Sequence, residues 1–133
     1  MAKIPNSHRG LLEGPVFVTL VTTMPDGQPQ ASPVWALLDG DDIIINTAVG
    51  RQKDKNLQNN PKTTLVAINP DNPYSYLEVR GEVADRIEDD EQTIDQMAKL
   101  YTGNDKYYGT VTPEDQREVR VTYRIRPKKV IAN

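Results

Sequence analysis

Six segments of this chain carry the residue pattern of β-strands, and most are joined by short turn sequences. They are Val16–Met24, Gln28–Leu38, Ile43–Thr47, Thr63–Ile68, Tyr74–Ile87 and Glu118–Arg126. Apolar and β-branched residues alternate in them with period two, or run together over strand-like lengths. The turns Pro25–Gly27 and Asp39–Asp41 are short enough to form hairpins. The pattern predicts a mainly β fold, an antiparallel barrel of six strands with a few helices.

Prolines mark the second of these segments as unusual. Gln28–Leu38 contains Pro29 and Pro33, which have no N–H group to donate to a neighbouring strand. The segment is therefore expected to lie at a sheet edge or to bulge near Pro33. Gly81, within Tyr74–Ile87, is expected at a bend or at a close approach between two backbones.

One helix is clear late in the chain. Asp89 is expected to cap its N-terminus with Gln92 at the third position, and Gly103 to end it. Its apolar residues follow the spacing of a single helical face. They are Ile94, Met97, Ala98 and Tyr101.

Length, charge and hydropathy restrict the class of protein. The 133 residues predict a single domain over positions 1–133. A net charge of −3 argues against a nucleic-acid partner. Neither a long apolar run nor a signal-peptide pattern occurs, so we expect a cytoplasmic protein with no membrane partner.

The residue types exclude several kinds of chemistry. The chain has no cysteine and one histidine, His8, in a polar N-terminal stretch. A thiolate nucleophile, a disulfide framework and a Cys/His metal site are therefore not expected. No carboxylate pair has a spacing that indicates proton transfer, so no catalytic residue is identified. If the chain is an enzyme, we expect a bound cofactor to carry the chemistry.

The segment Ile43–Leu57 is the strongest indication of a binding site. A β-branched run ends at Thr47, a small-residue turn follows, and Arg51, Lys53 and Lys55 then stand at the start of a helix. Cations at a helix N-terminus oppose the helix dipole. The arrangement is favourable if an anion, most simply a phosphate, binds there between backbone N–H groups and the Thr47 hydroxyl.

The helical spacing leaves two arrangements open. At about 100° per residue, Arg51 and Lys55 would share a face, and Lys53 would point away from it. All three cations meet at one anion only if Arg51–Lys53 belongs to the turn. The alternative is a solvated helix whose cations are balanced by Asp54.

Four blocks of sequence resemble the pyridoxamine-phosphate-oxidase-like family of flavin and deazaflavin enzymes, especially its small F420-dependent reductases. The blocks are Val21–Trp35, Asn46–Lys62, Asn69–Val83, and Ile94–Gly103 followed by Val119–Val130. They occur in the family's order and span nearly the whole chain. The chain lacks the arginine-and-lysine strand motif of the true pyridoxamine phosphate oxidases, which argues against vitamin B6 oxidation.

The resemblance implies a fold and a set of binding residues. The fold is a split β-barrel homodimer with two cofactor sites at the subunit interface. Arg51, Lys53 and Thr47 would bind the cofactor phosphate, with Lys55 and Asn56 matching by position. The ring would lie along Ser32, Pro33, Val34 and Trp35. Tyr74 and Tyr76 fall in the region that the second subunit contributes.

Some of these residues have a structural alternative. Trp35 could instead pack in the barrel or the dimer interface. Tyr74 and Tyr76 could form a half-buried pair on the sheet surface. Arg120, Arg124 and Arg126 are expected to pair across the sheet with acidic residues such as Glu78 and Glu82. The alternative is a minor role in cofactor binding, as an exposed cationic surface for the polyglutamate tail of a deazaflavin.

The resemblance implies an oxidoreductase that uses coenzyme F420 for hydride transfer with a small organic substrate. FMN is the alternative cofactor, because both carry a phosphate. Two other classes of function stay open: a non-catalytic flavin-binding carrier or sensor, and a β-barrel interaction protein without a cofactor.

Overall fold

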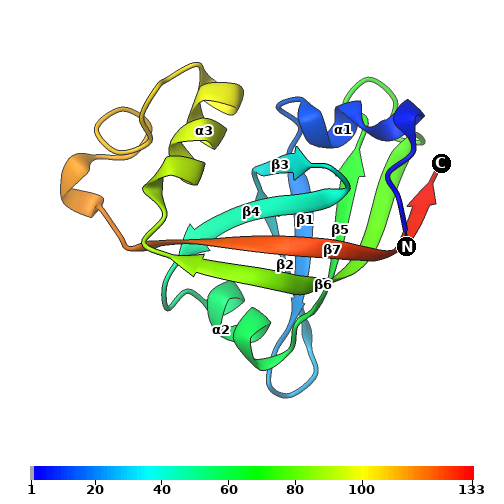
Figure 1. The fold of residues 1–133 in the computed structure, drawn as a ribbon, viewed down its shortest axis with the longest axis horizontal. Helices are drawn as coiled ribbons and strands as arrows, with labels where there is room; N and C mark the ends of the chain where they lie inside the picture. Colours follow the sequence, from blue (N-terminus) through cyan, green and yellow to red (C-terminus); the bar gives the residue numbers. More distant parts are fainter. Residues whose placement is uncertain (1) are drawn as a thin grey trace.

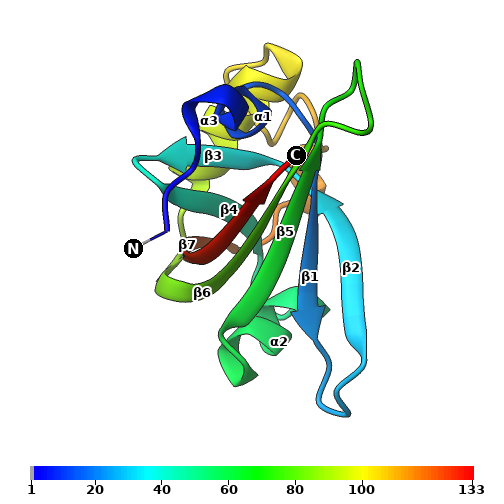
Figure 2. The ribbon, with the colours of Figure 1, turned by 90° about the vertical axis from the view of Figure 1, so that its right-hand side faces the viewer.

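The computed structural model describes residues 2–133, in which seven strands form one antiparallel sheet (Figure 1). The strands are β1 (Val18–Thr23), β2 (Pro29–Val34), β3 (Ala36–Asp39), β4 (Asp42–Ala48), β5 (Lys62–Ile68), β6 (Tyr76–Glu88) and β7 (Arg120–Ala132). Their order across the sheet is β2-β1-β5-β6-β7-β4-β3. The sheet curls, so that β3 and β4 cross steeply over β1 and β2 (Figure 2). The mainly β, antiparallel prediction is confirmed.

The prediction of six strands was wrong by one, because the segment Gln28–Leu38 is two strands. β2 pairs with β1, whereas β3 pairs with β4 at the opposite end of the sheet. The chain changes partners at Trp35, two residues after Pro33, and the next amide, Ala36 N, donates to Tyr101 Oη at 3.0 Å. The edge position expected from the prolines is confirmed for β2.

The main core fills the inside of the curl. Alternate residues of each strand face it, as the period-two pattern predicts. The largest fully buried side chains include Leu20, Ile43, Ile45, Leu65, Leu77, Tyr123 and Ile125.

Helix α3 (Glu91–Thr102) covers part of the outer face of the sheet. Its buried residues Ile94 and Met97 pack with Ile44 of β4 in a second, smaller cluster. Gly103 ends the helix in a left-handed conformation, as predicted. The cap, however, is Asp90 rather than Asp89, since the Asp90 side chain accepts from Thr93 N at 3.2 Å.

Two further helices complete the chain. α1 (Gly10–Glu13) follows a 3-10 turn at Asn6–His8, and α2 (Gln52–Asn59) joins β4 to β5. A second 3-10 turn, Glu114–Gln116, lies in the long connection before β7. Within residues 2–133, no helix has the length and apolar character needed to cross a membrane.

Candidate functional site

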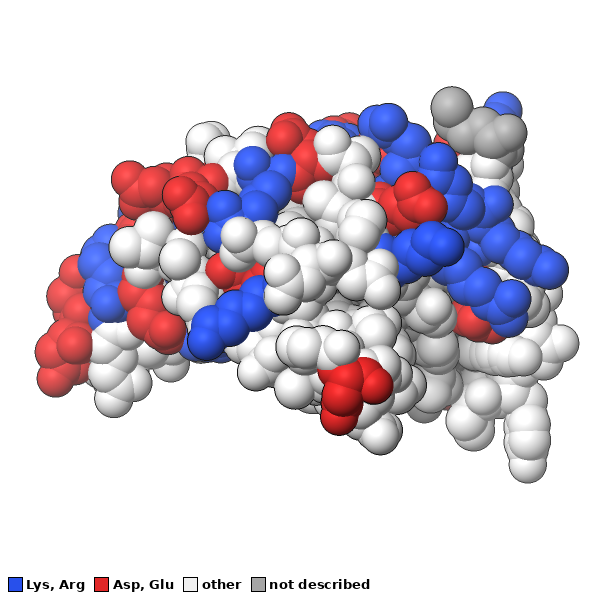
Figure 3. Space-filling view, turned by 90° about the horizontal axis from the view of Figure 1, so that it is seen from below, with Lys and Arg blue, Asp and Glu red and all other residues white. Residues whose placement is uncertain are grey.

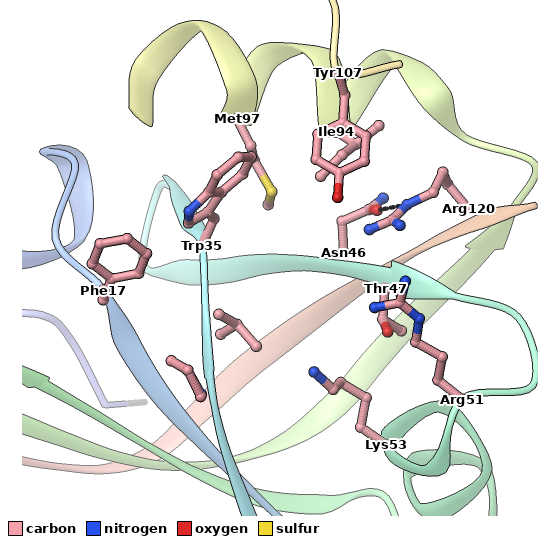
Figure 4. Close-up of a pocket in the computed structure, with 12 residues that line it drawn as sticks. Phe17, Trp35, Asn46, Thr47, Arg51, Lys53, Ile94, Met97, Tyr107 and Arg120 are labelled. Atoms are coloured by element: carbon pink, nitrogen blue, oxygen red, sulfur yellow. Dashed lines mark hydrogen bonds between the residues drawn. The ribbon is translucent and has the colours of Figure 1, made fainter. Parts of the chain in front are cut away.

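A pocket forms where the change of partners at Trp35 leaves part of β4 without a neighbouring strand on one side. β3 pairs with β4 only as far as Ile45, so Asn46 and Thr47 lie beyond the end of β3. The pocket, of about 180 Å³, wraps this free edge between α2 and α3 (Figure 4). It is lined by Phe17, Pro33, Val34, Trp35, Asn46, Thr47, Arg51, Lys53, Ile94, Met97, Tyr107 and Arg120.

Three cations line one end of this pocket. Arg51 is the N-cap residue of α2 and has an extended backbone, so it precedes the helix rather than belonging to its first turn. The helical-wheel angle between Arg51 and Lys53 therefore does not apply, and both side chains reach the pocket. Arg120 enters from β7 and is only 4% exposed.

The charges at this end are not balanced by the protein. Arg51 donates to Glu118 at 2.5 Å. Within residues 2–133, Lys53 and Arg120 form no ion pair, which leaves the group of three cations and one carboxylate with two excess positive charges. Burial, together with the nearby Arg51 and Arg120, holds the pKa of Lys53 below its usual value of 10.5.

Two buried polar atoms at the same end lack a partner. In the described residues, Thr47 Oγ1 and Arg120 Nη1 make no hydrogen bond, although both are enclosed. A buried donor without an acceptor costs about 1–3 kcal/mol. The cluster formed by Thr47, Arg51, Lys53 and Arg120, which we call the cationic end, is therefore suited to an anionic ligand with several acceptor oxygens.

The other end of the pocket is apolar and aromatic. Trp35 stacks on Tyr101, with ring centroids 5.1 Å apart and planes inclined by 17°. It also meets Tyr107 edge to face at 5.9 Å. Trp35 thus packs against α3 and lines the pocket at the same time. Phe17, which is 66% exposed, stands at the mouth near Tyr101.

A buried carboxylate holds the turn before α2 in place. Asp54 Oδ2 accepts from Gly50 N at 2.9 Å, while Oδ1 accepts from Tyr123 Oη at 2.5 Å and from Arg86 Nη2 at 2.9 Å. Burial acts to raise the pKa of Asp54, but these hydrogen bonds and the charge of Arg86 together hold it below 3.8. Asp54 therefore anchors the turn and does not balance the lysines of α2.

The structure brings six of the eleven predicted binding residues to the pocket. These are Pro33, Val34, Trp35, Thr47, Arg51 and Lys53. Three others lie on the predicted elements but outside the pocket: Ser32 precedes it on β2, Lys55 is exposed, and Asn56 is fully buried. The Asn56 amide donates to Thr22 Oγ1 at 3.0 Å, so its role is to fix α2 against the sheet.

Tyr74 and Tyr76 do not reach the pocket of this chain. Tyr74 is 83% exposed in the connection between β5 and β6, and Tyr76 begins β6. The expectation for both concerns the pocket of a second subunit, so it stays a prediction.

The sequence interpretation missed several pocket residues, of which Arg120 is the most important. It was expected to pair with acidic residues on a sheet surface, but it is buried and donates to Asn46 Oδ1 at 2.8 Å. The structural role expected for Arg124 and Arg126 is seen, with Asp42 as the partner of both rather than Glu78 or Glu82. The apolar stripe of α3 could have indicated the burial of Arg120, because that stripe must pack against a face of the sheet.

Comparison with known proteins identifies the fold and the family. The family model described as pyridoxamine 5'-phosphate oxidase matches residues 4–132. A search among curated proteins finds no match. Among solved structures, an F420 reductase is 35% identical, with a TM-score of 0.83 over 96% of this chain and 98% of that chain.

More distant structures share the fold alone. A conserved hypothetical protein from Mycobacterium tuberculosis is 18% identical, with a TM-score of 0.72 over 97% of this chain and 84% of that one. HutZ, the heme storage protein from Vibrio cholerae, is 15% identical, with a TM-score of 0.67 over 98% of this chain and 95% of that chain. These matches confirm the split-barrel fold. Because the family model spans nearly the whole sequence, the chain belongs to the pyridoxamine 5'-phosphate oxidase family.

Proposed function

We propose that this protein is a cytoplasmic oxidoreductase that uses coenzyme F420 for hydride transfer with a small organic substrate, and that it acts as a homodimer. Family membership supports a flavin-type cofactor and either oxidoreductase chemistry or flavin binding. F420 is preferred over FMN because the F420 reductase aligns over almost the full length of both chains. FMN is the alternative, since it also combines a phosphate with a flat ring.

The cationic end of the pocket is the observation that carries this proposal. Two excess positive charges and two unpartnered buried donors suit a phosphate group. In this assignment, Arg51, Lys53 and Thr47 hold the phosphate at the free edge of β4. Pro33, Val34 and Trp35 lie along the ring.

The chain's own contribution is to bind, orient and exclude water. When bound, the cofactor supplies the hydride chemistry. Trp35 is immobilised by its stack on Tyr101, so it presents a fixed aromatic surface to a flat ligand. Ile94 and Met97 of α3 provide apolar cover near this surface, which keeps water from the reacting groups.

The small volume of the pocket and the exposed apolar side chains near it support the proposal that a second subunit completes the site. Its volume is below the roughly 300–1,000 Å³ of typical small-molecule sites. Three exposed apolar side chains lie at the pocket or on the segments that carry its cations: Phe17, Val49 and Val119. A partner chain that covered them would enclose the ligand. Seen from below, basic side chains gather at the right of the face, and acidic and basic side chains are mixed at its left (Figure 3).

Spectroscopic titration tests the proposal. Purified protein is titrated with F420 and separately with FMN while the absorbance of the cofactor and the fluorescence of Trp35 are recorded. Trp35 is the only tryptophan of the chain, so its quenching reports on this pocket. We expect F420 to bind and to be reduced or oxidised in the presence of a substrate. Binding of neither cofactor would overturn the proposal, and binding without turnover would favour a carrier.

A further inference from the structure

Arg120 is an unusual residue for the interior of a sheet. Its side chain is 4% exposed, and within the described residues it has no carboxylate partner. Nε donates to Asn46 Oδ1 at 2.8 Å, while Nη1 is enclosed and unbonded. A buried cation that lacks an anion is costly, because the interior replaces its hydration only in part.

The guanidinium is nevertheless held firmly. Its central carbon lies 5.2 Å from the centre of the Tyr107 ring, on the face that attracts cations. With Asn46 and Tyr107 as its neighbours, Arg120 faces the pocket from the side opposite Arg51 and Lys53 (Figure 4). A side chain that is fixed before a ligand arrives loses little entropy on binding.

A chain of hydrogen bonds fixes Asn46 in turn. The Asn46 amide donates to Thr122 Oγ1 at 2.9 Å, and that hydroxyl donates to Asp90 Oδ2 at 2.7 Å. Asp90 is the N-cap of α3. The amide oxygen of Asn46 is therefore directed at Arg120, and the guanidinium is connected to the start of α3, the helix that covers the apolar end of the pocket.

We propose that Arg120 is a phosphate ligand of the pocket, and that its free Nη1 and the free hydroxyl of Thr47 donate to the same phosphate group as Lys53. For the identity of the ligand, this inference rests on the proposed function. It follows from three features at one place: an enclosed cation that forms no ion pair with a carboxylate, two unpartnered donors, and an excess of positive charge that favours an anionic phosphate group.

The test compares ligands with and without phosphate. Wild-type protein, Arg120→Gln and the control Arg126→Gln are titrated with FMN and riboflavin, and with F420 and its phosphate-free deazaflavin precursor, by quenching of Trp35. Arg126 lies on the same strand but pairs with Asp42 outside the pocket. We expect Arg120→Gln to weaken binding of the phosphate-bearing ligand roughly 10- to 100-fold and binding of the phosphate-free ligand less than about 3-fold. Arg126→Gln should change neither.

The outcomes separate this inference from the proposed function. If Arg120→Gln weakens both members of a pair equally, or neither, Arg120 is not a phosphate ligand. If wild-type protein binds no flavin or deazaflavin, the proposed function fails and the inference is decided with inorganic phosphate. Phosphate should then raise the melting temperature of wild-type protein and raise that of Arg120→Gln much less. An equal shift in both proteins would overturn the inference, and Arg120→Lys, which keeps the charge, should show an intermediate shift.

Discussion

At the scale of single residues, Lys53 and Lys55 provide a matched pair. Both stand in the first half of α2, but Lys53 is half-buried at the cationic end and Lys55 is exposed outside the pocket. Lys53→Ala should weaken cofactor binding by about 1.5–3 kcal/mol, because it removes one charge-assisted hydrogen bond. The dissociation constant from the Trp35 titration measures this change.

Lys55→Ala is the control, and we expect its affinity to stay within about 0.5 kcal/mol of the wild type. Equal losses in the two variants would mean that only the overall charge of α2 matters. An unchanged affinity in Lys53→Ala would place the phosphate elsewhere.

The contribution of Asp54 to the stability of the fold should depend on pH. Because its pKa is lower in the folded protein than the ordinary 3.8, ionised Asp54 stabilises the fold above about pH 4, and this contribution is lost as the pH falls through the lowered pKa. Asp54→Asn should therefore cost about 3 kcal/mol at about pH 7, since it leaves Arg86 without its buried partner. Urea unfolding at about pH 7 and about pH 3 measures the difference.

The cost of Asp54→Asn should shrink at the acidic pH, where wild-type Asp54 begins to be protonated. Asp105→Asn is the control, because the Asp105 side chain is 85% exposed and should contribute little at either pH. A cost of Asp54→Asn that does not change with pH would show that the charge of Asp54 has no part in holding the turn.

At the scale of elements, β6 and β7 approach each other closely at Gly81. A Cβ atom there would lie 2.7 Å from the backbone oxygen of Arg126 and 2.9 Å from a methyl group of Ile125. The pairing of β6 with β7 also shifts register at this point, which confirms the close approach expected for Gly81. Gly81→Ala should therefore lower the free energy of unfolding by about 1–3 kcal/mol, as overpacking does.

Gly10→Ala is the control for this substitution, because a Cβ at Gly10 meets nothing within 4 Å. Chemical denaturation of the two variants measures the contrast. A Gly81→Ala protein as stable as the wild type would mean that β6 and β7 separate at little cost.

The local sequence pattern predicted the helices and strands well, except where a contact between residues far apart in the sequence determines where a strand ends. The alternation in β1 and β7 and the apolar stripe of α3 are properties of neighbouring residues, so the sequence reveals them. The break at Trp35 is different. Pro33 indicates an edge, but the reversal onto β4 depends on Tyr101, which lies 65 residues from Ala36 along the chain. Arg120 was missed for the same reason, since its burial depends on α3.

At the scale of the whole molecule, some residues of the site could be predicted from a single segment of sequence, and others could not because the fold brings them together. Thr47, Arg51 and Lys53 lie within one short segment. The sequence indicated this segment as an anion site because cations at the start of a helix are unfavourable without an anion. Asn46, Tyr107 and Arg120 come together only through the curl of the sheet and the connection between α3 and β7. The expectation for Asn56 rested on its position in the segment, whereas the fold turns that side chain inward.

The open pocket makes a prediction about assembly. Light scattering at micromolar protein concentration should give twice the 14.9 kDa mass of one chain. Phe17→Asp should shift the protein toward monomer and weaken cofactor binding together, because it places a charge on an apolar surface at the pocket mouth. A monomer that binds cofactor with full affinity would contradict the assignment of the pocket to a subunit interface.

A crystal structure of the protein with the cofactor that the titration selects tests the central claim most directly. We predict that the phosphate lies at the free edge of β4, within hydrogen-bond distance of Lys53 Nζ, Thr47 Oγ1 and Arg120 Nη1, and that the ring lies along Trp35. A phosphate bound away from the cationic end, with Thr47 and Arg120 still unpartnered, would contradict the account.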